Sequence, residues 1–304
     1  MSEPRLDVAM QRPGAHVVGE IDGNPVVESA APTENHAPRT PALELRHVTK
    51  IFTLPNGKQT TAVRDVTLVV EDVAERGEVV SVLGPSGCGK STILNCVAGL
   101  APHHPPTTGE VLVRGEHVGG PSASRGMVFQ AYTSFPHLTV LDNVAFGLRV
   151  RGMERDERHA KALDWIGRVG LKGHEHKYPH QLSGGQQQRV AIARTLACRP
   201  QMILMDEPFG ALDPATRREM QELLLSIYRD PAIEVTILLV THSVVEAVYL
   251  STKIVLMKPN PGEIVKLWDL APPSHSFEET RTQPTFVKLV AEIESRLRGR
   301  DVDA

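Results

Sequence analysis

A glycine-rich loop carries the residues with the clearest chemistry in this sequence. It reads Gly84-Pro85-Ser86-Gly87-Cys88-Gly89-Lys90-Ser91-Thr92 and satisfies the phosphate-loop pattern. Its glycines let the backbone turn tightly and bring successive N–H groups close to phosphate oxygens. We therefore predict that residues 84–92 bind ATP. In this pattern Lys90 reaches the β- and γ-phosphates and serves catalysis, while the Ser91 hydroxyl ligates Mg²⁺.

Cys88 lies inside this loop, at the N-terminus of the helix that we expect to follow it. A helix dipole lowers the pKa of a thiol at that position. We therefore expect a reactive Cys88, whose alkylation blocks ATP binding and which bound ATP protects.

Two adjacent carboxylates, Asp206 and Glu207, follow the continuous apolar run Met202–Met205. Such a run is typical of a strand buried on both faces, and ligands bind at the carboxyl ends of parallel strands. Neighbouring side chains point different ways, so one carboxylate can hold Mg²⁺ while the other polarises the attacking water. An isolated Asp-Glu pair is usually a solvated strand end. Beside a phosphate loop, we predict Asp206 as a metal ligand and Glu207 as the catalytic carboxylate.

The segments around these groups alternate between two kinds of hydrophobic pattern. Strand patterns fall at residues 43–50, 63–70, 78–83, 111–113, 126–129, 202–205, 235–240, 253–257 and 263–267. Helical patterns fall at residues 90–100, 157–169, 186–198, 214–229 and 244–250. Strands that alternate with helices predict an α/β fold, a largely parallel sheet with helices on its faces.

The composition divides the chain into three parts. Residues 1–40 mix Pro, Glu, Asn, Ala and Gly without a period, which predicts a disordered tail, with a docking role as the alternative. Residues 41–270 form the predicted ATPase domain, and a stretch of about 133–185 without strand runs is its helical subdomain. Residues 271–304 are a short C-terminal extension, Pro-rich and then weakly helical.

Bulk properties exclude several classes of protein. Of the 304 residues, 41% are hydrophobic and 23% charged, so a packed core is expected. The net charge of -3 gives no reason to expect nucleic-acid binding. Three scattered cysteines fit reduced thiols in the cytosol better than a disulfide framework or a zinc site. No apolar run approaches the roughly 20 residues of a membrane span, and the N-terminus lacks a signal peptide's apolar region.

The string Leu182-Ser183-Gly184-Gly185-Gln186 resembles the signature of the ATP-binding cassette (ABC) transporter family. It precedes a helical pattern that stops before Pro200, so it offers a second helix N-terminus with exposed N–H donors. One ATP needs only one cradle. We therefore expect a two-fold dimer in which Ser183, Gly184, Gly185 and Gln186 of one copy complete the ATP site of the other.

The resemblance covers residues 43–267 and implies further roles. Gln130 would sense Mg²⁺ and the attacking water, as a metal-site and catalytic residue, where the transmembrane partner docks. Ala211-Leu212-Asp213 would cross the dimer interface, and His242 would be the switch histidine that contacts the γ-phosphate. Phe52 would stack on adenine, with core packing as the alternative. The implied fold is a phosphate-loop NTPase core with an N-terminal antiparallel β-subdomain and a helical insert carrying the signature.

Several strings are similar to importers of the nitrate, sulfonate and taurine type. They are Phe135–Val140, Asp142–Val144, Pro208–Asp213, Thr216-Arg217 and Glu246–Leu250. Ser243 differs, because many members carry Asp there. The resemblance implies an ATP-hydrolysing importer subunit that works as a homodimer or with a second ABC ATPase. Its other partners would be permease subunits and, indirectly, an extracytoplasmic solute-binding protein. It would lie in the cytoplasm, peripherally on the inner membrane. The alternatives are a soluble non-transport ABC ATPase and the ATPase of an exporter.

Overall fold

The computed structural model describes residues 15–21, 24–29, 40–73, 77–130 and 133–299, in two compact units divided after Arg39. In the first unit, β1 (Ala15–Ile21) pairs antiparallel with β2 (Asn24–Ser29). The remainder of that unit lies outside the described residues, so the disorder predicted for residues 1–40 stays a prediction.

A six-stranded sheet forms the centre of the second unit. Its order is β12 (Glu263–Asp269), β11 (Lys253–Lys258), β5 (Val79–Leu83), β10 (Thr236–Thr241), β9 (Met202–Asp206) and β8 (Arg125–Val128). All neighbours are parallel except β12, which is antiparallel to β11. Every residue of β5 and β10 is buried, as expected for strands covered on both faces. The predicted largely parallel sheet is confirmed.

The register of this sheet brings the chemistry-bearing segments to one edge. Thr241 lies opposite Leu83, and Val240 lies opposite Asp206. The carboxyl ends of β5, β9 and β10 therefore end side by side. The phosphate loop, the carboxylate pair and His242 all follow from those ends.

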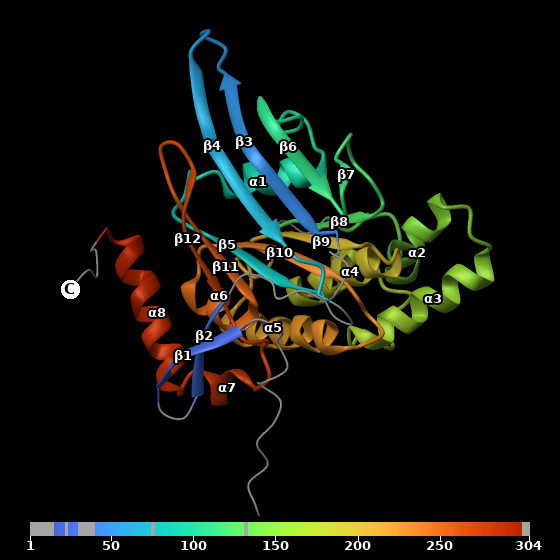
Figure 1. Cartoon of the computed structure of the whole chain (residues 1–304). Coiled ribbons are helices and arrows are strands. Elements are labelled where there is room, and N and C mark those ends of the chain that lie inside the picture. The colour runs from blue at the N-terminus through green and yellow to red at the C-terminus, as the bar shows by residue number, and fades with distance from the viewer. Residues whose placement is uncertain (1–14, 22–23, 30–39, 74–76, 131–132, 300–304) are drawn as a thin grey trace, which may run out of the picture. The chain divides into compact units, whose positions relative to one another are not determined.

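A second, antiparallel sheet confirms the predicted β-subdomain. Its order is β4 (Gln59–Val70), β3 (Leu43–Thr53), β6 (Thr108–Val113) and the two-residue β7 (Glu116–His117), which the sequence pattern missed. Helix α1 (Lys90–Ala98) contacts strands of both sheets (Figure 1). Its buried Ile93, Leu94 and Val97 join one hydrophobic cluster with residues of β4 and the central sheet.

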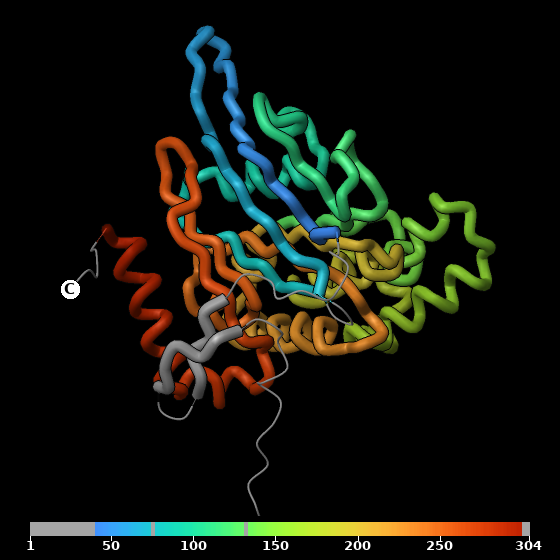
Figure 2. The backbone as a smooth tube through the Cα atoms, viewed as in Figure 1, coloured from blue at the N-terminus to red at the C-terminus, as the bar shows by residue number. Residues whose placement is uncertain are grey.

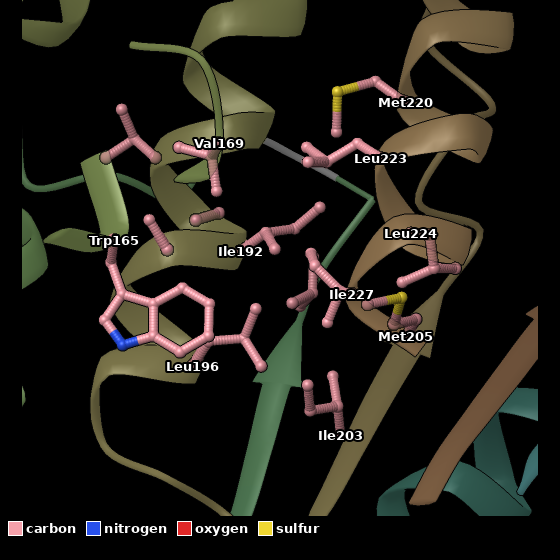
Figure 3. Close-up of a cluster of buried hydrophobic side chains, with 14 of the residues drawn as sticks. Trp165, Val169, Ile192, Leu196, Ile203, Met205, Met220, Leu223, Leu224 and Ile227 are labelled. Atoms are coloured by element: carbon pink, nitrogen blue, oxygen red, sulfur yellow. The ribbon is translucent and has the colours of Figure 1, made fainter. Parts of the chain in front are cut away.

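The opposite face of the central sheet carries α4 (Gly184–Ala197) and α5 (Pro214–Arg229). Figure 3 shows Ile192 and Leu196 of α4 close to Ile203 and Met205 of β9, in a cluster that α5 completes. Between β8 and α4 the chain runs through α2 (Val140–Val150), α3 (Arg155–Arg168) and a 3₁₀ turn (Pro179–Gln181), as Figure 2 traces. The described part of this segment contains no strand, which confirms the predicted helical insert.

The C-terminal extension packs on the same core. It forms α7 (Phe277–Thr280) and α8 (Pro284–Leu297) beside α6 (Val244–Leu250). Phe277 is buried edge-to-face against Tyr249 of α6, with ring centroids 5.1 Å apart. Of the helices in the described part of the chain, none has the length and hydrophobicity needed to cross a membrane.

Candidate functional site

The loop between β5 and α1 is shaped by close backbone approaches that only glycine permits. Gly87 and Gly89 adopt left-handed φ angles of 80° and 88°, which cost another residue about 1–2 kcal/mol each. A Cβ on Gly84 would lie 2.6 Å from Cys88 Sγ and 2.7 Å from the Met257 carbonyl oxygen. A Cβ on Gly89 would lie 2.3 Å from Val63 Cγ1. The glycine pattern is therefore a requirement of this cradle.

Lys90 is buried at the first position of α1, with only 7% of its surface exposed. Its ammonium donates hydrogen bonds to the carbonyl oxygens of Gly84, at 2.8 Å, and Pro85, at 3.0 Å. The charge is thus held over the start of the loop. No side chain caps α1, so the first N–H groups and the positive end of the helix dipole remain for an anion.

Ser91 and Asp206 meet between α1 and the end of β9. The Ser91 hydroxyl donates to Asp206 Oδ1 over 3.2 Å. Burial raises the pKa of Asp206, and the Ser91 hydrogen bond offsets only part of that effect. A hydroxyl and a desolvated carboxylate beside a phosphate cradle are the oxygen ligands that suit Mg²⁺. The described residues hold no cluster of three or more His, Cys, Asp or Glu side chains that could bind a metal ion.

Glu207 turns away from the end of β9 toward β10. Its backbone has a left-handed φ of 45°, and its N–H donates to the Val240 carbonyl oxygen over 3.0 Å. Glu207 Oε2 lies 3.3 Å from His242 Nδ1. A Cβ added to Gly210 would lie 3.4 Å from Gln130 Nε2 and 3.7 Å from Glu207 Oε2. The Glu207 carboxylate and the His242 imidazole are therefore in contact, and the Gln130 amide lies near Glu207 on the other side of Gly210.

The signature string begins α4. Ser183 is the N-cap, and its hydroxyl accepts from Gln186 N over 3.3 Å, while Gln186 Oε1 accepts from Ser183 N over 3.0 Å. Gly185 packs so closely on α5 that a Cβ would lie 2.3 Å from Thr216 Cγ2. Gly184 is the first helical residue. Helices α1 and α4 join different clusters on opposite faces of the central sheet. Within the described residues, no hydrogen bond joins the signature to the phosphate loop of the same chain.

Comparisons with known proteins agree with this geometry. A family profile described as ABC transporter matches residues 70–210. An uncharacterized ABC transporter ATP-binding protein of Methanocaldococcus jannaschii is 50% identical over 228 residues, 74% of this chain and 82% of that protein. The chain belongs to the ABC transporter family. As an ABC cassette it is an ATP-binding and ATP-hydrolysing subunit.

Other relatives of the cassette have more specific names. Taurine import ATP-binding protein TauB of Yersinia pestis (strain Antiqua) is 48% identical over 205 residues, 67% of this chain and 77% of that protein. Nitrate import ATP-binding protein NrtD of Synechocystis is 40% identical over 267 residues, 86% of this chain and 97% of that protein.

Two solved structures of one bacterial cassette have the same fold. A dimeric bacterial ABC transporter cassette superposes with a TM-score of 0.64 at 34% identity, covering 75% of this chain and 99% of that one. A post-hydrolysis form of that dimer, bound to ADP and Pi, gives a TM-score of 0.63 at 32% identity with the same coverage.

The expected lowering of the Cys88 pKa is wrong for this cassette, whereas the expected block of ATP binding by alkylation stays a prediction. The residue is fully buried, and burial raises the pKa of its thiol, an effect that the nearby Lys90 ammonium only partly offsets. The helix dipole argument neglected desolvation, which disfavours a thiolate.

Phe52 is half-buried on β3 and lies outside the described hydrophobic clusters. Its ring meets His103 edge-on, with centroids 5.3 Å apart, and Lys50 Nζ lies 5.4 Å from its centroid. Core packing is therefore not its role, and adenine stacking stays a prediction.

The cassette also contains support for the phosphate loop that sequence reasoning missed. The turn between β11 and β12 packs against the phosphate loop. A Cβ on Gly262 would lie 2.2 Å from the Cys88 carbonyl oxygen, and Gly262 N donates to the Ala62 carbonyl oxygen over 3.0 Å. The dipeptide Pro261-Gly262 is an ordinary turn signal, so nothing local indicated this contact.

A largely apolar groove of about 380 Å³ is lined by residues of β8, α2 and α4 and by Phe129, which precedes Gln130 in the sequence. Phe129 lines it at the end of β8 and is 39% exposed. Phe135 and Phe146 line it together, with ring centroids 4.4 Å apart. The groove therefore presents aromatic surface along β8.

Proposed function

We propose that the cassette works as a head-to-tail dimer that hydrolyses MgATP between its two copies and thereby drives solute import through separate permease subunits. One observation carries this proposal. The phosphate loop and the signature are each built as a helix N-terminus, yet they sit on helices that cover opposite faces of the central sheet. Each chain thus offers two halves of a site that meet only across a two-fold axis.

In this site the loop amides and Lys90 hold the phosphates, with Ser86 and Thr92 inside the cradle. The Ser183–Gln186 end of the partner's α4 closes it. Ser91, Asp206 and Gln130 would hold Mg²⁺. When bound, the ion neutralises charge on the β- and γ-phosphate oxygens.

Glu207 acts on the attacking water. The water oxygen bonds to the γ-phosphorus, the bond to the β–γ bridging oxygen breaks, and Glu207 positions the water or accepts its proton. His242 lies 3.3 Å from the carboxylate and is 64% exposed, so it can turn toward the γ-phosphate without losing a buried contact. The Gln130 amide, just after β8, lies near Glu207 across Gly210 and would orient the water.

The groove lined by Phe129, Phe135 and Phe146 supports permease docking on this surface. Phe129 is exposed and Phe135 and Phe146 are half-buried, and aromatic side chains beside polar groups are typical of protein interfaces. Motion of Gln130 during hydrolysis would reach a docked helix directly, because Phe129 is its neighbour in the chain. The cassette would then lie on the cytoplasmic face of the membrane through that partner.

The importer assignment rests on relatives rather than on the site. Two relatives are named as taurine and nitrate import ATP-binding proteins. A small solute that carries a sulfonate group, such as taurine, or the nitrate ion is therefore the class to test first.

The test of the dimeric site is Glu207→Gln. The amide keeps the shape of the side chain and cannot take a proton, so turnover should fall about 100-fold or more while ATP is still bound. The ATP-loaded variant should elute as a dimer, and the nucleotide-free variant should not. Glu71→Gln, at an exposed position, is the matched control and should behave as wild type. Near-normal turnover of Glu207→Gln would remove this residue from the mechanism.

The test of docking is Phe146→Ala. It should reduce co-purification of a polytopic membrane subunit and leave ATP affinity within about twofold of wild type. Unchanged co-purification would exclude the groove as the permease contact.

A reconstituted complex whose ATPase activity fails to respond to taurine, an alkanesulfonate or nitrate would exclude that solute class.

A further inference from the structure

Glu246 is a buried carboxylate that the mechanism above does not use. It lies in the first turn of α6 and is only 8% exposed. A buried carboxylate is costly unless hydrogen bonds and a positive charge compensate it. Its two oxygens face two different elements. Oε2 accepts from the Thr241 hydroxyl over 2.7 Å, and Oε1 accepts from Gln221 Nε2 of α5 over 3.2 Å.

The first set of contacts fixes the loop that carries His242. Thr241 is the last residue of β10, and its hydroxyl also accepts from Ser243 N over 3.0 Å. Ser243 in turn caps α6 by accepting from Glu246 N over 3.3 Å. Both neighbours of His242 are therefore anchored on Glu246, while the imidazole itself remains largely exposed.

The second set of contacts leads to the predicted interface loop, Ala211–Asp213. Arg217 of α5 donates from Nη2 to the Leu212 carbonyl oxygen over 3.1 Å. Its Nε lies 3.9 Å from Glu246 Oε1 and is buried without a hydrogen-bond partner. That distance is about 1 Å longer than a hydrogen bond. A cavity of about 260 Å³ lined by Arg217, Ser243 and Glu246 leaves room for the pair to close.

We propose that Glu246 is a positioning residue that links the His242 loop to the Ala211–Asp213 loop of the same copy. One carboxylate oxygen holds the end of β10. The other carboxylate oxygen accepts from Gln221 and faces Arg217, which donates to the Leu212 carbonyl oxygen. When His242 shifts toward a γ-phosphate, Glu246 moves with it and closes the distance to Arg217. Arg217 then shifts the Ala211–Asp213 loop, to which it is bonded at Leu212. This inference rests on the proposed roles of His242 and of the dimer.

The decisive variant is Glu246→Gln, which keeps the size of the side chain and removes its charge. The expected result is a kcat about 10- to 100-fold lower, with the dissociation constant for ATP within about twofold of wild type. Glu222→Gln is the matched control. Glu222 also links α5 to α6, through the Tyr249 hydroxyl, but it contacts neither loop. It should lower the melting temperature without lowering kcat.

Arg217→Met tests the same link without disturbing the bonds from Glu246 to Thr241 and Gln221. Arg217→Met should lower kcat as Glu246→Gln does. The double variant Glu246→Gln/Arg217→Met should be no slower than the slower single variant, because the two substitutions break the same connection. Additive losses would refute the link, and so would wild-type turnover of Arg217→Met. If Glu246→Gln fails to fold, Arg217→Met alone still decides.

The parallel variant His242→Ala separates this inference from the proposed function. If His242→Ala loses turnover while Glu246→Gln and Arg217→Met keep it, only the link is wrong. If His242→Ala and Glu207→Gln both keep turnover, the proposed catalytic site itself is wrong.

Discussion

Replacing Gly262 by alanine tests whether the turn between β11 and β12 sets the shape of the phosphate loop. Gly262 is buried and its φ is not in the left-handed region, so the cost of a side chain comes from close approach alone. The new Cβ would lie 2.2 Å from the Cys88 carbonyl oxygen and 2.8 Å from the Ala62 carbonyl oxygen.

The size of the effect follows from that distance. Close carbon–oxygen contacts in proteins are about 3.3 Å, so the Cys88 carbonyl must move by about 1 Å. The peptide unit is planar, and the same displacement therefore moves the N–H of Gly89, one of the cradle donors. A misplacement of about 1 Å in a binding site costs roughly 100-fold, equivalent to about 2.7 kcal/mol.

The measurement is the equilibrium affinity for ATP, with the melting temperature as a check on folding. Gly262→Ala should weaken ATP binding about 100-fold. Gly119→Ala is the control, because its φ is likewise ordinary and its Cβ would meet nothing within 4 Å. A folded Gly262→Ala protein with wild-type ATP affinity would falsify the idea that this turn supports the loop.

Three further predictions concern the same edge of the sheet. Lys90→Ala removes the ammonium that bonds to Gly84 and Pro85, and it should lower ATP affinity about 100-fold or more in a titration; an unchanged affinity would contradict the assignment of Lys90 to phosphate binding. Asp206→Asn should raise the melting temperature of the nucleotide-free protein at pH 7 and give no gain below about pH 4, as thermal unfolding at the two pH values would show. The sign follows from the raised pKa of Asp206, because stability from this group is present at low pH and is lost as pH rises through the folded-state pKa. Cys88 should react with iodoacetamide at pH 7.5 only as fast as the protein opens, since burial raises its pKa; labelling of the folded protein at the rate of a free cysteine peptide would show the thiol to be accessible.

The sequence by itself determined the parts of the site whose chemistry is local. A phosphate cradle needs glycines, a lysine and a hydroxyl in one short loop, so Gly84–Thr92 was identifiable without a fold. Asp206 and Glu207 could be predicted as site residues because the continuously apolar run before them indicates a buried parallel strand, and ligands bind at the carboxyl ends of such strands. The alternation of strands and helices gave the parallel sheet, and the sheet's register then explains why distant segments share one edge.

Only the tertiary structure decided what depends on contacts between segments far apart in the chain. Gly262 lies in the turn between β11 and β12 and packs against the Cys88 carbonyl group of the phosphate loop. Nothing next to Gly262 in the sequence indicates this contact. In the sequence, Glu246 is an ordinary residue in the first turn of a predicted helix. Only the fold brings Thr241 of β10 and Gln221 of α5 into contact with its carboxylate and buries it. The pKa of Cys88 also depends on distant segments of the chain. The local helix dipole predicted a lowered pKa, whereas burial by neighbouring segments raises it, because desolvation is a property of the whole packed environment.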